Sequence, residues 1–298
     1  MAGTLRLPHR SFPRLRRLLW RAMSESTAVV NRLLDALPPG RWLHRRVLRG
    51  IGLVPLEMRV GASHAGLDGL RVAFLSDIHA GSFMGEEDLA QVFDLVMAAE
   101  PDVICLGGDL INTLERELWI LERPLQRLRA RHGIHAVPGN HDHYFGRDIG
   151  AWKSWLTARG VNVLDNRGMR IERGGASLWL CGVDELTEGT PDLPRALAGR
   201  RPGEPCLLLA HHPDSFVEAI GHGVDLVLSG HTHGGQVRIG SWAPVHHSRM
   251  GWDAGWFRVG ASSLYVSRGV GVTLLPVRIG APPEVCVVTL RAAAPLPA

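Results

Sequence analysis

From about residue 56 onward, short apolar runs alternate with longer stretches of helical periodicity. Apolar residues recur at helical spacing over 86–99, 114–131, 148–159 and 213–220, which predicts helices there. The intervening runs are almost continuously apolar, as is typical of strands buried on both faces in a layered α/β fold. The predicted strands are 71–76, 103–106, 134–137, 178–181, 206–210, 225–229, 264–267 and 285–290.

The first fifty residues follow a different pattern, in which apolar residues at helical spacing are interleaved with arginines. Residues 12–22 and 29–37 predict two amphipathic helices that stop at Pro38-Pro39-Gly40, and a further basic stretch covers 41–49. We therefore divide the chain into a basic amphipathic segment, residues 1–55, and a main domain, residues 56–298. The 298 residues are enough to bury one large core.

Charge is concentrated in the same N-terminal segment. Residues 1–50 contain eleven arginines and two acidic residues, whereas the remaining 248 residues hold 22 basic and 27 acidic side chains. A basic amphipathic helix can lie on an anionic membrane, with Trp20 and Trp42 at the interface, or pack on the main domain with its arginines solvated. The charge exceeds what solubility requires, which favours peripheral membrane binding. Nucleic acid is a poorer partner, because aromatic residues are sparse there and the main domain is acidic.

Other features of the chain bear on its location. No run of about 18 apolar residues predicts a transmembrane helix, and the first thirty residues lack the apolar region and cleavage site of a signal peptide. The four cysteines (Cys105, Cys181, Cys206 and Cys286) stand far apart in apolar runs, a pattern typical of buried reduced thiols. These features predict a cytoplasmic protein, peripheral at the inner face of the membrane if the N-terminal segment binds lipid.

Metal-binding residue types follow five of the predicted strands, directly where each strand ends. Sites in open α/β sheets form at the carboxyl ends of strands, so we expect the five segments to converge. Each segment alone is a weak signal, but their joint occurrence predicts a metal site. The segments are Ser76-Asp77-Ile78-His79, Gly107-Gly108-Asp109, Gly139-Asn140-His141-Asp142, His211-His212-Pro213 and Gly230-His231-Thr232-His233-Gly234.

The spacing within these segments fits two ions. Asp77 and His79 are two residues apart and project to the same side of an extended stretch, so one ion can take both. His231 and His233 lie roughly 6–7 Å apart along a strand, which suits one histidine on each of two ions. Asp109 is a suitable bridging carboxylate, because the two glycines before it let the backbone approach closely. The side chain of Asn140 offers a neutral carbonyl oxygen.

The motifs DIH, GGD, GNHD, HHP and GHTHGGQ, in this order, resemble those of the calcineurin-like metallophosphoesterases over residues 56–290. The later segments 265–271 and 276–278 look most like a bacterial subgroup with membrane-associated phosphodiesterases and a UDP-2,3-diacylglucosamine pyrophosphatase. The resemblance implies a four-layer α/β/β/α sandwich and a hydrolase with two divalent metal ions. It places one ion on Asp77, His79, Asp109 and His233, and the other on Asp109, Asn140, His211 and His231.

The resemblance also implies roles for neighbouring residues. It favours His211 over His212 as a ligand, because the family's single histidine falls at the first position. His141 is the candidate for protonating the leaving oxygen or holding a phosphoryl oxygen, with Asp142 orienting it. His143 stands where tyrosine is frequent in relatives. Outside the motifs, His246 and His247 are candidates for the mouth of the site, and Asp184-Glu185 lies near it or forms a turn.

The expected chemistry follows from charge. Two divalent ions outweigh two carboxylates, which leaves a positive cavity that attracts phosphate and lowers the pKa of a bound water. Oxygen and nitrogen ligands without thiolate suit manganese, our first expectation, and also iron or zinc. We expect hydrolysis of a phosphodiester or pyrophosphate, in a lipid or lipid precursor. The alternatives are a phosphomonoesterase (including a protein phosphatase), a cyclic-nucleotide phosphodiesterase, a nuclease and a non-catalytic, metal-stabilised membrane adaptor, and the fold alone does not decide between them.

Overall fold

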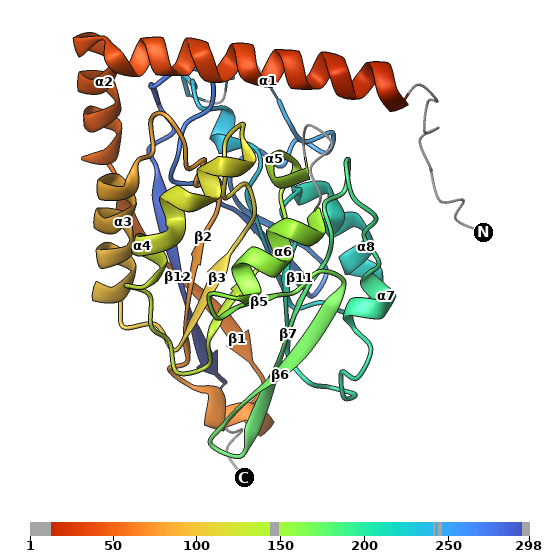
Figure 1. Ribbon diagram of the computed structural model, residues 1–298. Helices are drawn as coiled ribbons and strands as arrows, with labels where there is room; N and C mark the ends of the chain where they lie inside the picture. Colours follow the sequence, from red (N-terminus) through yellow and green to blue (C-terminus); the bar gives the residue numbers. More distant parts are fainter. Residues whose placement is uncertain (1–12, 144–148, 241, 244–245, 294–298) are drawn as a thin grey trace.

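Two six-stranded mixed sheets form the centre of the molecule in the computed structural model, which describes residues 13–143, 149–240, 242–243 and 246–293 (Figure 1). The first sheet has the order β1 (Gly52–Val60), β12 (Glu284–Ala292), β2 (Arg71–Leu75), β3 (Val103–Leu106), β4 (Ile134–Ala136) and β5 (Val161–Val163). The second has the order β10 (Gly255–Val259), β11 (Ser262–Val266), β9 (Leu226–Ser229), β8 (Cys206–Leu209), β7 (Ala176–Gly182) and β6 (Arg167–Arg173).

The strand directions put several carboxyl ends at the same edge. Strands β2, β3, β4 and β5 are parallel in the first sheet, as are β7, β8, β9 and β11 in the second. Antiparallel pairing is confined to β12 with β2, β6 with β7 and β10 with β11 within the described residues.

Helices cover the outer face of each sheet, which completes four layers. On the first sheet lie α3 (Glu86–Ala98), α4 (Glu122–Leu125) and α6 (Ile149–Thr157), and on the second lie α7 (Leu193–Ala196) and α8 (Phe216–Gly221) (Figure 1). The remaining short elements are α5 (Asn140–His143) and the 3₁₀ helices at Ala62–Leu67, Glu115–Leu121, Pro213–Ser215 and His233–Gly235.

Alternating side chains along the strands build the cores between these layers. In β2, Val72 and Phe74 pack between the two sheets, whereas Ala73 and Leu75 pack against the helices of the first sheet. A further core under α7 and α8 contains the fully buried Phe216. The expected four-layer α/β/β/α sandwich is therefore confirmed.

The eight predicted strands are all present, but the predicted helix over 114–131 is wrong. The chain instead forms a 3₁₀ helix, Glu115–Leu121, and a single turn of α-helix, Glu122–Leu125. Pro124 prevents a continuous helix over 114–131, because it has no N–H to donate to the carbonyl of Ile120 one turn earlier. The Glu117 side chain accepts hydrogen bonds from the amides of Thr113 and Leu114 and so caps the 3₁₀ turn.

The N-terminal segment forms one long helix and one short one. The two helices predicted over 12–22 and 29–37 are continuous in α1 (Pro13–Ala36), because no proline or glycine separates them; Phe12 lies outside the described residues. The Pro38-Pro39-Gly40 break is the start of α2 (Pro38–Leu48), which turns away from α1 (Figure 1). Strand β1 begins at Gly52, so the division at residue 55 falls inside it, and the two-part division stays a prediction.

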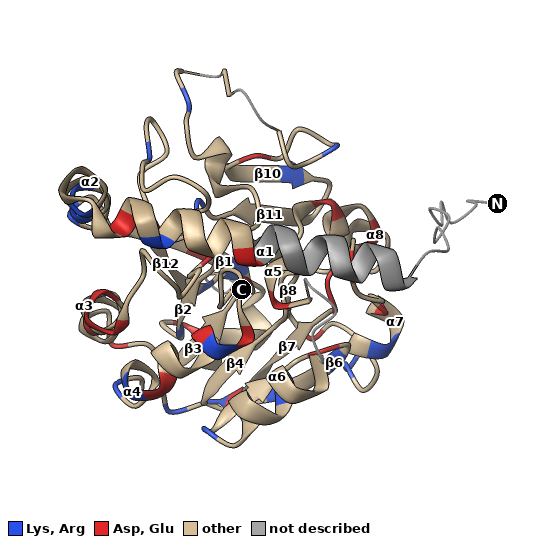
Figure 2. Ribbon diagram, turned by 45° about the horizontal axis from the view of Figure 1, so that its top comes forward, with Lys and Arg blue, Asp and Glu red and all other residues tan. Residues whose placement is uncertain are grey.

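Across the described residues, no helix is both long and apolar enough to cross a membrane. α1 instead runs across the end of the sandwich at which the parallel strands finish, above α5 in both views (Figures 1 and 2). It is anchored there by Leu34, which packs with Val47 of α2 and with Phe83 and Val272 of the main domain.

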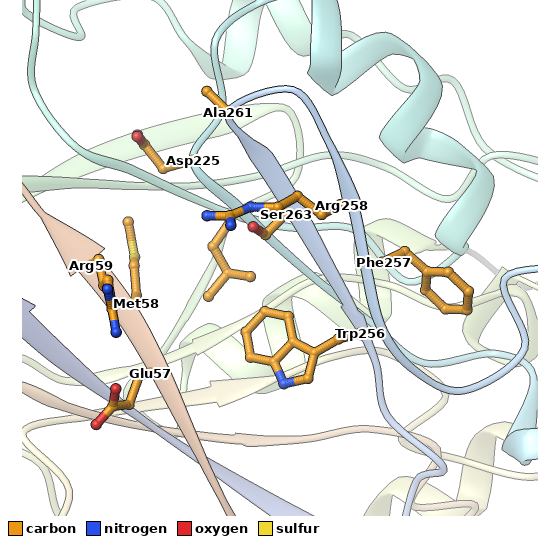
Figure 3. Close-up of a pocket in the computed structure, with 10 residues that line it drawn as sticks. Glu57, Met58, Arg59, Asp225, Trp256, Phe257, Arg258, Ala261 and Ser263 are labelled. Carbon is orange, nitrogen blue, oxygen red and sulfur yellow. The ribbon is translucent and has the colours of Figure 1, made fainter.

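The free edges of the two sheets leave a pocket on a side of the sandwich. Glu57 and Arg59 of β1 and Trp256 and Arg258 of β10 line it (Figure 3). The described lining of this pocket includes none of the predicted metal ligands, so it is separate from the candidate site below.

Candidate metal centre

The candidate site lies where strands of both sheets end. Asp77 and Asp109 follow β2 and β3 of the first sheet, and Asn140 is the first residue of α5, after β4. His211 and His231 follow β8 and β9 of the second sheet. The sandwich therefore brings together five segments that are separated by up to about 150 residues in sequence, as the pattern of strand ends predicts.

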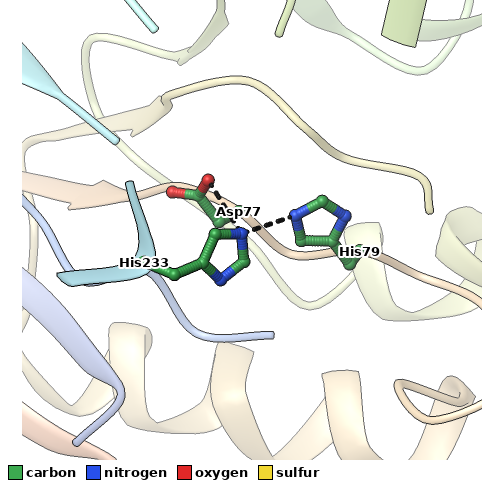
Figure 4. A group of neighbouring side chains, drawn as sticks. All are labelled: Asp77, His79 and His233. Atoms are coloured by element: carbon green, nitrogen blue, oxygen red, sulfur yellow. Dashed lines mark hydrogen bonds and ion pairs between the residues drawn. The ribbon is translucent and has the colours of Figure 1, made fainter. Parts of the chain in front are cut away.

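One group of side chains is formed by Asp77, His79 and His233 (Figure 4). The Nε2 atoms of the two histidines lie 3.0 Å apart, and His233 Nε2 lies 3.5 Å from Asp77 Oδ1. All three side chains are buried. Their ligand atoms are close enough to bind a single cation.

A second group is formed around the side chain of Asn140. Its Oδ1 atom lies 2.7 Å from His231 Nδ1 and 3.2 Å from His211 Nε2. The His211 Nδ1–H donates to the carbonyl of Gly107 over 2.8 Å, which leaves the Nε2 lone pair towards the site.

Asp109 lies between the two groups. Its Oδ2 atom is 3.6 Å from His79 Nε2 in the first group and 3.3 Å from His211 Nε2 in the second. Its Oδ1 atom accepts the backbone amide of His141 over 2.7 Å. The same carboxylate thus reaches both groups, as a bridging ligand must.

A buried carboxylate oxygen of the first group fits a cation. Within the part of the chain that the structure describes, Asp77 Oδ2 has no hydrogen-bond partner. Buried polar atoms are ordinarily hydrogen-bonded, and exceptions call for a reason such as an ion. Two imidazole nitrogens and a carboxylate facing one point form a donor set that suits a divalent transition metal.

Burial and mutual proximity control the protonation of these side chains. Burial raises the pKa of Asp77 and depresses the pKa values of His79, His231 and His233 well below the ordinary range. These three histidines are consequently neutral near pH 7, which is the form that binds metals.

His211 behaves differently because of its carboxylate neighbour. Burial opposes its charged form, but Asp109 outweighs that effect and raises the pKa of His211 to about 10. Burial would raise the pKa of Asp109, yet His211 and His141 hold it well below its usual value. A metal ion bound here would replace the proton of His211, so metal binding releases that proton.

The backbone of the site adopts an uncommon conformation. Five of the seven predicted ligands have positive φ angles: 53° for Asp77, 49° for His79, 53° for Asp109, 72° for His231 and 53° for His233. Left-handed residues other than glycine are uncommon, and each costs about 1–2 kcal/mol. Such strain clusters at functional sites, where the surrounding structure holds it in place.

Two glycines allow the segments to approach this closely. Gly108 has a φ of 92°, and a Cβ atom there would lie 2.7 Å from His211 Nδ1. A Cβ atom on Gly230 would lie 2.2 Å from Asp77 Oδ2. Both distances are shorter than a van der Waals contact, so the two motif glycines are required by packing.

His141 lies at the edge of both groups. Its ring contacts His79 edge-on at 4.6 Å, and its ligand nitrogen lies within reach of His79 and Asp109. Its Nδ1–H donates to the carbonyl of Asn112 over 2.5 Å, so Nε2 is the nitrogen that can act on a substrate.

Asp142 holds the neighbouring backbone. Its carboxylate accepts the amide of Leu110 over 3.1 Å and that of Gly139 over 2.9 Å, and so ties the turn after β3 to the turn after β4. The predicted role of Asp142 in orienting His141 stays a prediction, because His141 Nδ1–H donates to a backbone carbonyl, that of Asn112.

Several other histidines surround the second group. His212 packs its ring on His231 at 4.3 Å and accepts the amide of Asp214 through Nδ1, as expected for a neighbour of the site. The ring centroids of His247 and His231 lie 5.7 Å apart, and His246 pairs with Asp253 at 2.6 Å; that these two histidines line the mouth of the site stays a prediction.

The segment after β7 also meets the site region. His143 Nε2 lies 2.7 Å from Asp184 Oδ1, which connects α5 to this segment. Glu185 accepts the amides of Thr187 and Glu188 and forms the turn that the sequence suggested.

Arg278 is a contributor whose role the sequence did not reveal. Its guanidinium is partly buried, and Nη2 lies 3.1 Å from His233 Nδ1. It also donates to the carbonyls of Gly271 and Arg268 over 2.8 and 2.7 Å. The Pro276-Val277-Arg278 segment carried a family resemblance, but nothing in its spacing indicates contact with a residue 45 positions earlier.

We expect replacement of Arg278 by alanine to weaken metal binding by about 10–100-fold, because groups that orient ligands contribute that much. Manganese titration by calorimetry measures the effect. Arg268→Ala is the matched control, since Arg268 lies ten residues before Arg278 in the same segment between β11 and β12 but its guanidinium pairs with Glu284. Equal losses in both variants would mean that this segment is merely destabilised.

Comparison with known proteins gives consistent matches. The family model described as calcineurin-like phosphoesterase matches residues 70–235. The metallophosphoesterase YkuE of Bacillus subtilis is 33% identical over 232 residues, which cover 76% of this chain and 80% of YkuE. The phosphodiesterase YaeI of Escherichia coli is 31% identical over 230 residues, covering 74% of this chain and 82% of YaeI.

Longer and more distant proteins also match. A transmembrane protein with a metallophosphoesterase domain from Bos taurus is 33% identical over 80% of this chain, which spans only 56% of that protein. A solved dimetal phosphatase from Danio rerio has a TM-score of 0.45 and 10% identity, over 68% of this chain and 88% of that one. A structural similarity this low supports no functional conclusion.

Proposed function

The chain belongs to the calcineurin-like phosphoesterase family and is a metal-dependent hydrolase of phosphoester bonds, and from this premise we propose that it cleaves a phosphodiester or a pyrophosphate. The observation that carries the proposal is the position of Asp109. One of its carboxylate oxygens, Oδ2, lies within 3.6 Å of both His79 Nε2 in the first group and His211 Nε2 in the second. The similarity to a protein named as a phosphodiesterase supports a diester over a monoester.

We assign the ligands as the family resemblance places them. Asp77, His79, Asp109 and His233 would hold one divalent ion. Asp109, Asn140, His211 and His231 would hold the other. Bound there, the two ions would supply Lewis acidity and lower the pKa of a water.

The residues of the chain supply the rest of the mechanism. Only two carboxylates oppose the charge of two divalent ions, so a phosphate is attracted to the cavity. In its doubly protonated form, His141 is placed to donate the proton on Nε2 to the leaving oxygen, and the ring that remains is the Nδ1–H tautomer that the Asn112 carbonyl binds. Burial of the ligands excludes bulk water and strengthens these interactions.

We propose manganese as the metal, with iron and zinc as the alternatives. The donor atoms are carboxylate and amide oxygens and imidazole nitrogens. A site of this type without thiolates accepts several divalent ions, and their availability decides between them.

We further propose that the substrate is a lipid or a lipid precursor, as in the bacterial subgroup that the sequence resembles. The orientation of α1 supports this proposal. Asn31 is buried against the main domain, whereas Val29, Val30 and Leu33 are all more than half exposed. An outward apolar face beside arginines suits peripheral binding to the inner face of a membrane. The buried thiols of all four cysteines suit a reducing cytoplasm.

Hydrolysis of bis(p-nitrophenyl) phosphate beside p-nitrophenyl phosphate, with manganese added, tests the proposed reaction. We expect diester turnover that requires the metal and falls at least about 100-fold in Asn140→Ala, because one ion loses a ligand. Asn166→Ala is the matched control, since Asn166 is also buried but binds the segment from Asp184 to Asp192.

Other results would select the alternatives. Faster turnover of the monoester would indicate a phosphomonoesterase. Metal binding without turnover of either ester would indicate a non-catalytic adaptor.

A further inference from the structure

Exposed apolar side chains gather around the end of the molecule that holds the metal centre. One set lies on α1, α2 and their junction, and a second set lies on two loops of the main domain, residues 236–240 with Trp242 and residues 272–280, which we call the loop pair. Each of these side chains is more than half exposed. The first set is Val29, Val30, Leu33, Leu37 and Trp42, and the second is Ile239, Trp242, Leu274, Leu275 and Ile279.

The loop pair is a single structural unit. Gln236 Oε1 accepts the amide of Thr273 over 2.9 Å, and its Nε2 donates to the Thr273 carbonyl over 2.9 Å. The amide of Arg238 donates to the carbonyl of Ile279 over 2.7 Å. The two loops therefore present their apolar side chains together.

The loop pair is attached both to α1 and to the metal centre. Val272 packs with Leu34 of α1 in one small core, so the loops and the helix are neighbours. The first loop begins three residues after His233, and Arg278 in the second loop contacts that histidine.

The chemistry of the surface fits an anionic lipid bilayer. Arginines accompany the apolar side chains of α2. Arg46 stacks on Trp42, with its guanidinium carbon 5.8 Å from the ring centre, and a groove beside Trp42 is lined by Arg41, Arg45 and Arg49. Apolar and tryptophan side chains beside arginines are typical of surfaces that enter the headgroup region of an anionic membrane.

We infer that the loop pair is a second membrane contact, separate from the N-terminal helices, and that it holds the metal centre at the headgroup plane of an anionic bilayer. The inference rests on the proposed phosphodiester or pyrophosphate hydrolysis for its substrate. That substrate is a lipid whose phosphate lies at headgroup depth, because the loops that touch the bilayer continue directly into the metal ligands.

Sedimentation with vesicles of equimolar phosphatidylcholine and phosphatidylglycerol tests the contact in the full chain. The loop variant is Ile239→Ser, Leu274→Asn and Leu275→Ser. Leu274 has a φ of 60°, which asparagine adopts more readily than leucine, so the change does not add backbone strain. We expect at least about a tenfold loss of vesicle binding, because three apolar side chains no longer enter the bilayer.

The matched control carries serine at Leu53, Val217 and Val259, which are exposed apolar residues outside the loop pair. We expect it to bind vesicles as the wild type does. Turnover of bis(p-nitrophenyl) phosphate should be unchanged in both variants, which shows that each is folded.

Several outcomes would overturn the inference. Wild-type vesicle binding by the loop variant would exclude the contact. The same holds if the substitutions convert a dimer into a monomer in light scattering and leave vesicle binding intact, since the surface would then bind a second copy. Failure of the proposed hydrolysis would give a different result. The wild-type protein would then sediment with vesicles but turn over neither soluble nor lipid diesters.

Discussion

Asp109→Asn is expected to lower diester turnover by at least about 10³-fold and to prevent the binding of both ions. The change keeps the shape of the side chain but removes the charge of the one oxygen that lies within 3.6 Å of both histidine groups. Losing metal assistance costs several kcal/mol of transition-state stabilisation, and about 1.4 kcal/mol corresponds to a factor of ten. Metal content by mass spectrometry and turnover with saturating manganese measure the two effects.

Thermal unfolding separates this effect from a general loss of stability. Manganese should raise the melting temperature of the wild type, because a ligand that binds only the folded state stabilises it, but should leave that of Asp109→Asn unchanged. Glu204→Gln is the matched control: Glu204 is buried, and its carboxylate pairs with Arg170 at 2.7 Å and accepts hydrogen bonds from the Ser177 hydroxyl and the Arg201 amide. A variant that still binds two ions would show that Asp109 does not bridge them.

Replacing His141 by alanine is expected to lower turnover by about 10²–10³-fold on esters with poor leaving groups, with both ions still bound. The proton that Nε2 would donate matters most when the departing oxygen is strongly basic. For p-nitrophenyl esters, whose leaving group is stable as an anion, the loss should be much smaller. Turnover of paired phenyl and p-nitrophenyl diesters measures this difference.

His143→Ala is the control for His141, because both residues lie on α5 and the ring of His143 pairs with Asp184 instead. We expect a loss of less than about tenfold that does not depend on the leaving group. An equal loss on both esters in His141→Ala would identify His141 as a phosphate-binding or metal-binding group and not as the proton donor. Loss of one ion in that variant would identify it as a ligand.

The sequence predicted the central strands of the two sheets but not their edge strands. The predicted strands are buried on both faces, so they are almost purely apolar and easily recognised. The four strands without a prediction, β1, β5, β6 and β10, are the edge strands of the two sheets. In β1, exposed Glu57 and Arg59 alternate with buried Leu56 and Met58, a period-two pattern that a search for continuous apolar runs does not detect.

The candidate site was predictable for a related reason. Its ligand types follow buried strands, so strand order and residue type together indicated that Asp77, Asp109, Asn140, His211 and His231 converge. The contacts of Arg278 with His233 and of the Asn112 carbonyl with His141 were not predictable, because they depend on how loops return to the site. In addition, every residue has a backbone carbonyl, so the identity of Asn112 does not indicate that its carbonyl binds His141.

The sequence also did not predict which face of α1 packs on the main domain. Periodicity showed an apolar face and a basic face, but not which of them meets the main domain. In the structure, Asn31 is buried while Val29 and Leu33 face outward. Over residues 25–36, whose side chains the structure describes, the helix packs through a narrow strip containing Ala28 and Leu34, which leaves Val29, Val30 and Leu33 available for a partner.

The left-handed backbone at five of the seven predicted ligands restricts how this protein can change over evolutionary time. Aspartate and histidine tolerate positive φ better than most residues, and only glycine adopts it at no cost. A descendant that no longer needed the metals would meet a steric barrier to alanine, valine or leucine at these turns even though the chemistry had become dispensable. Inactive relatives should therefore carry glycine or asparagine at these positions. These residues would identify a former metal centre in a sequence that has lost the ligands.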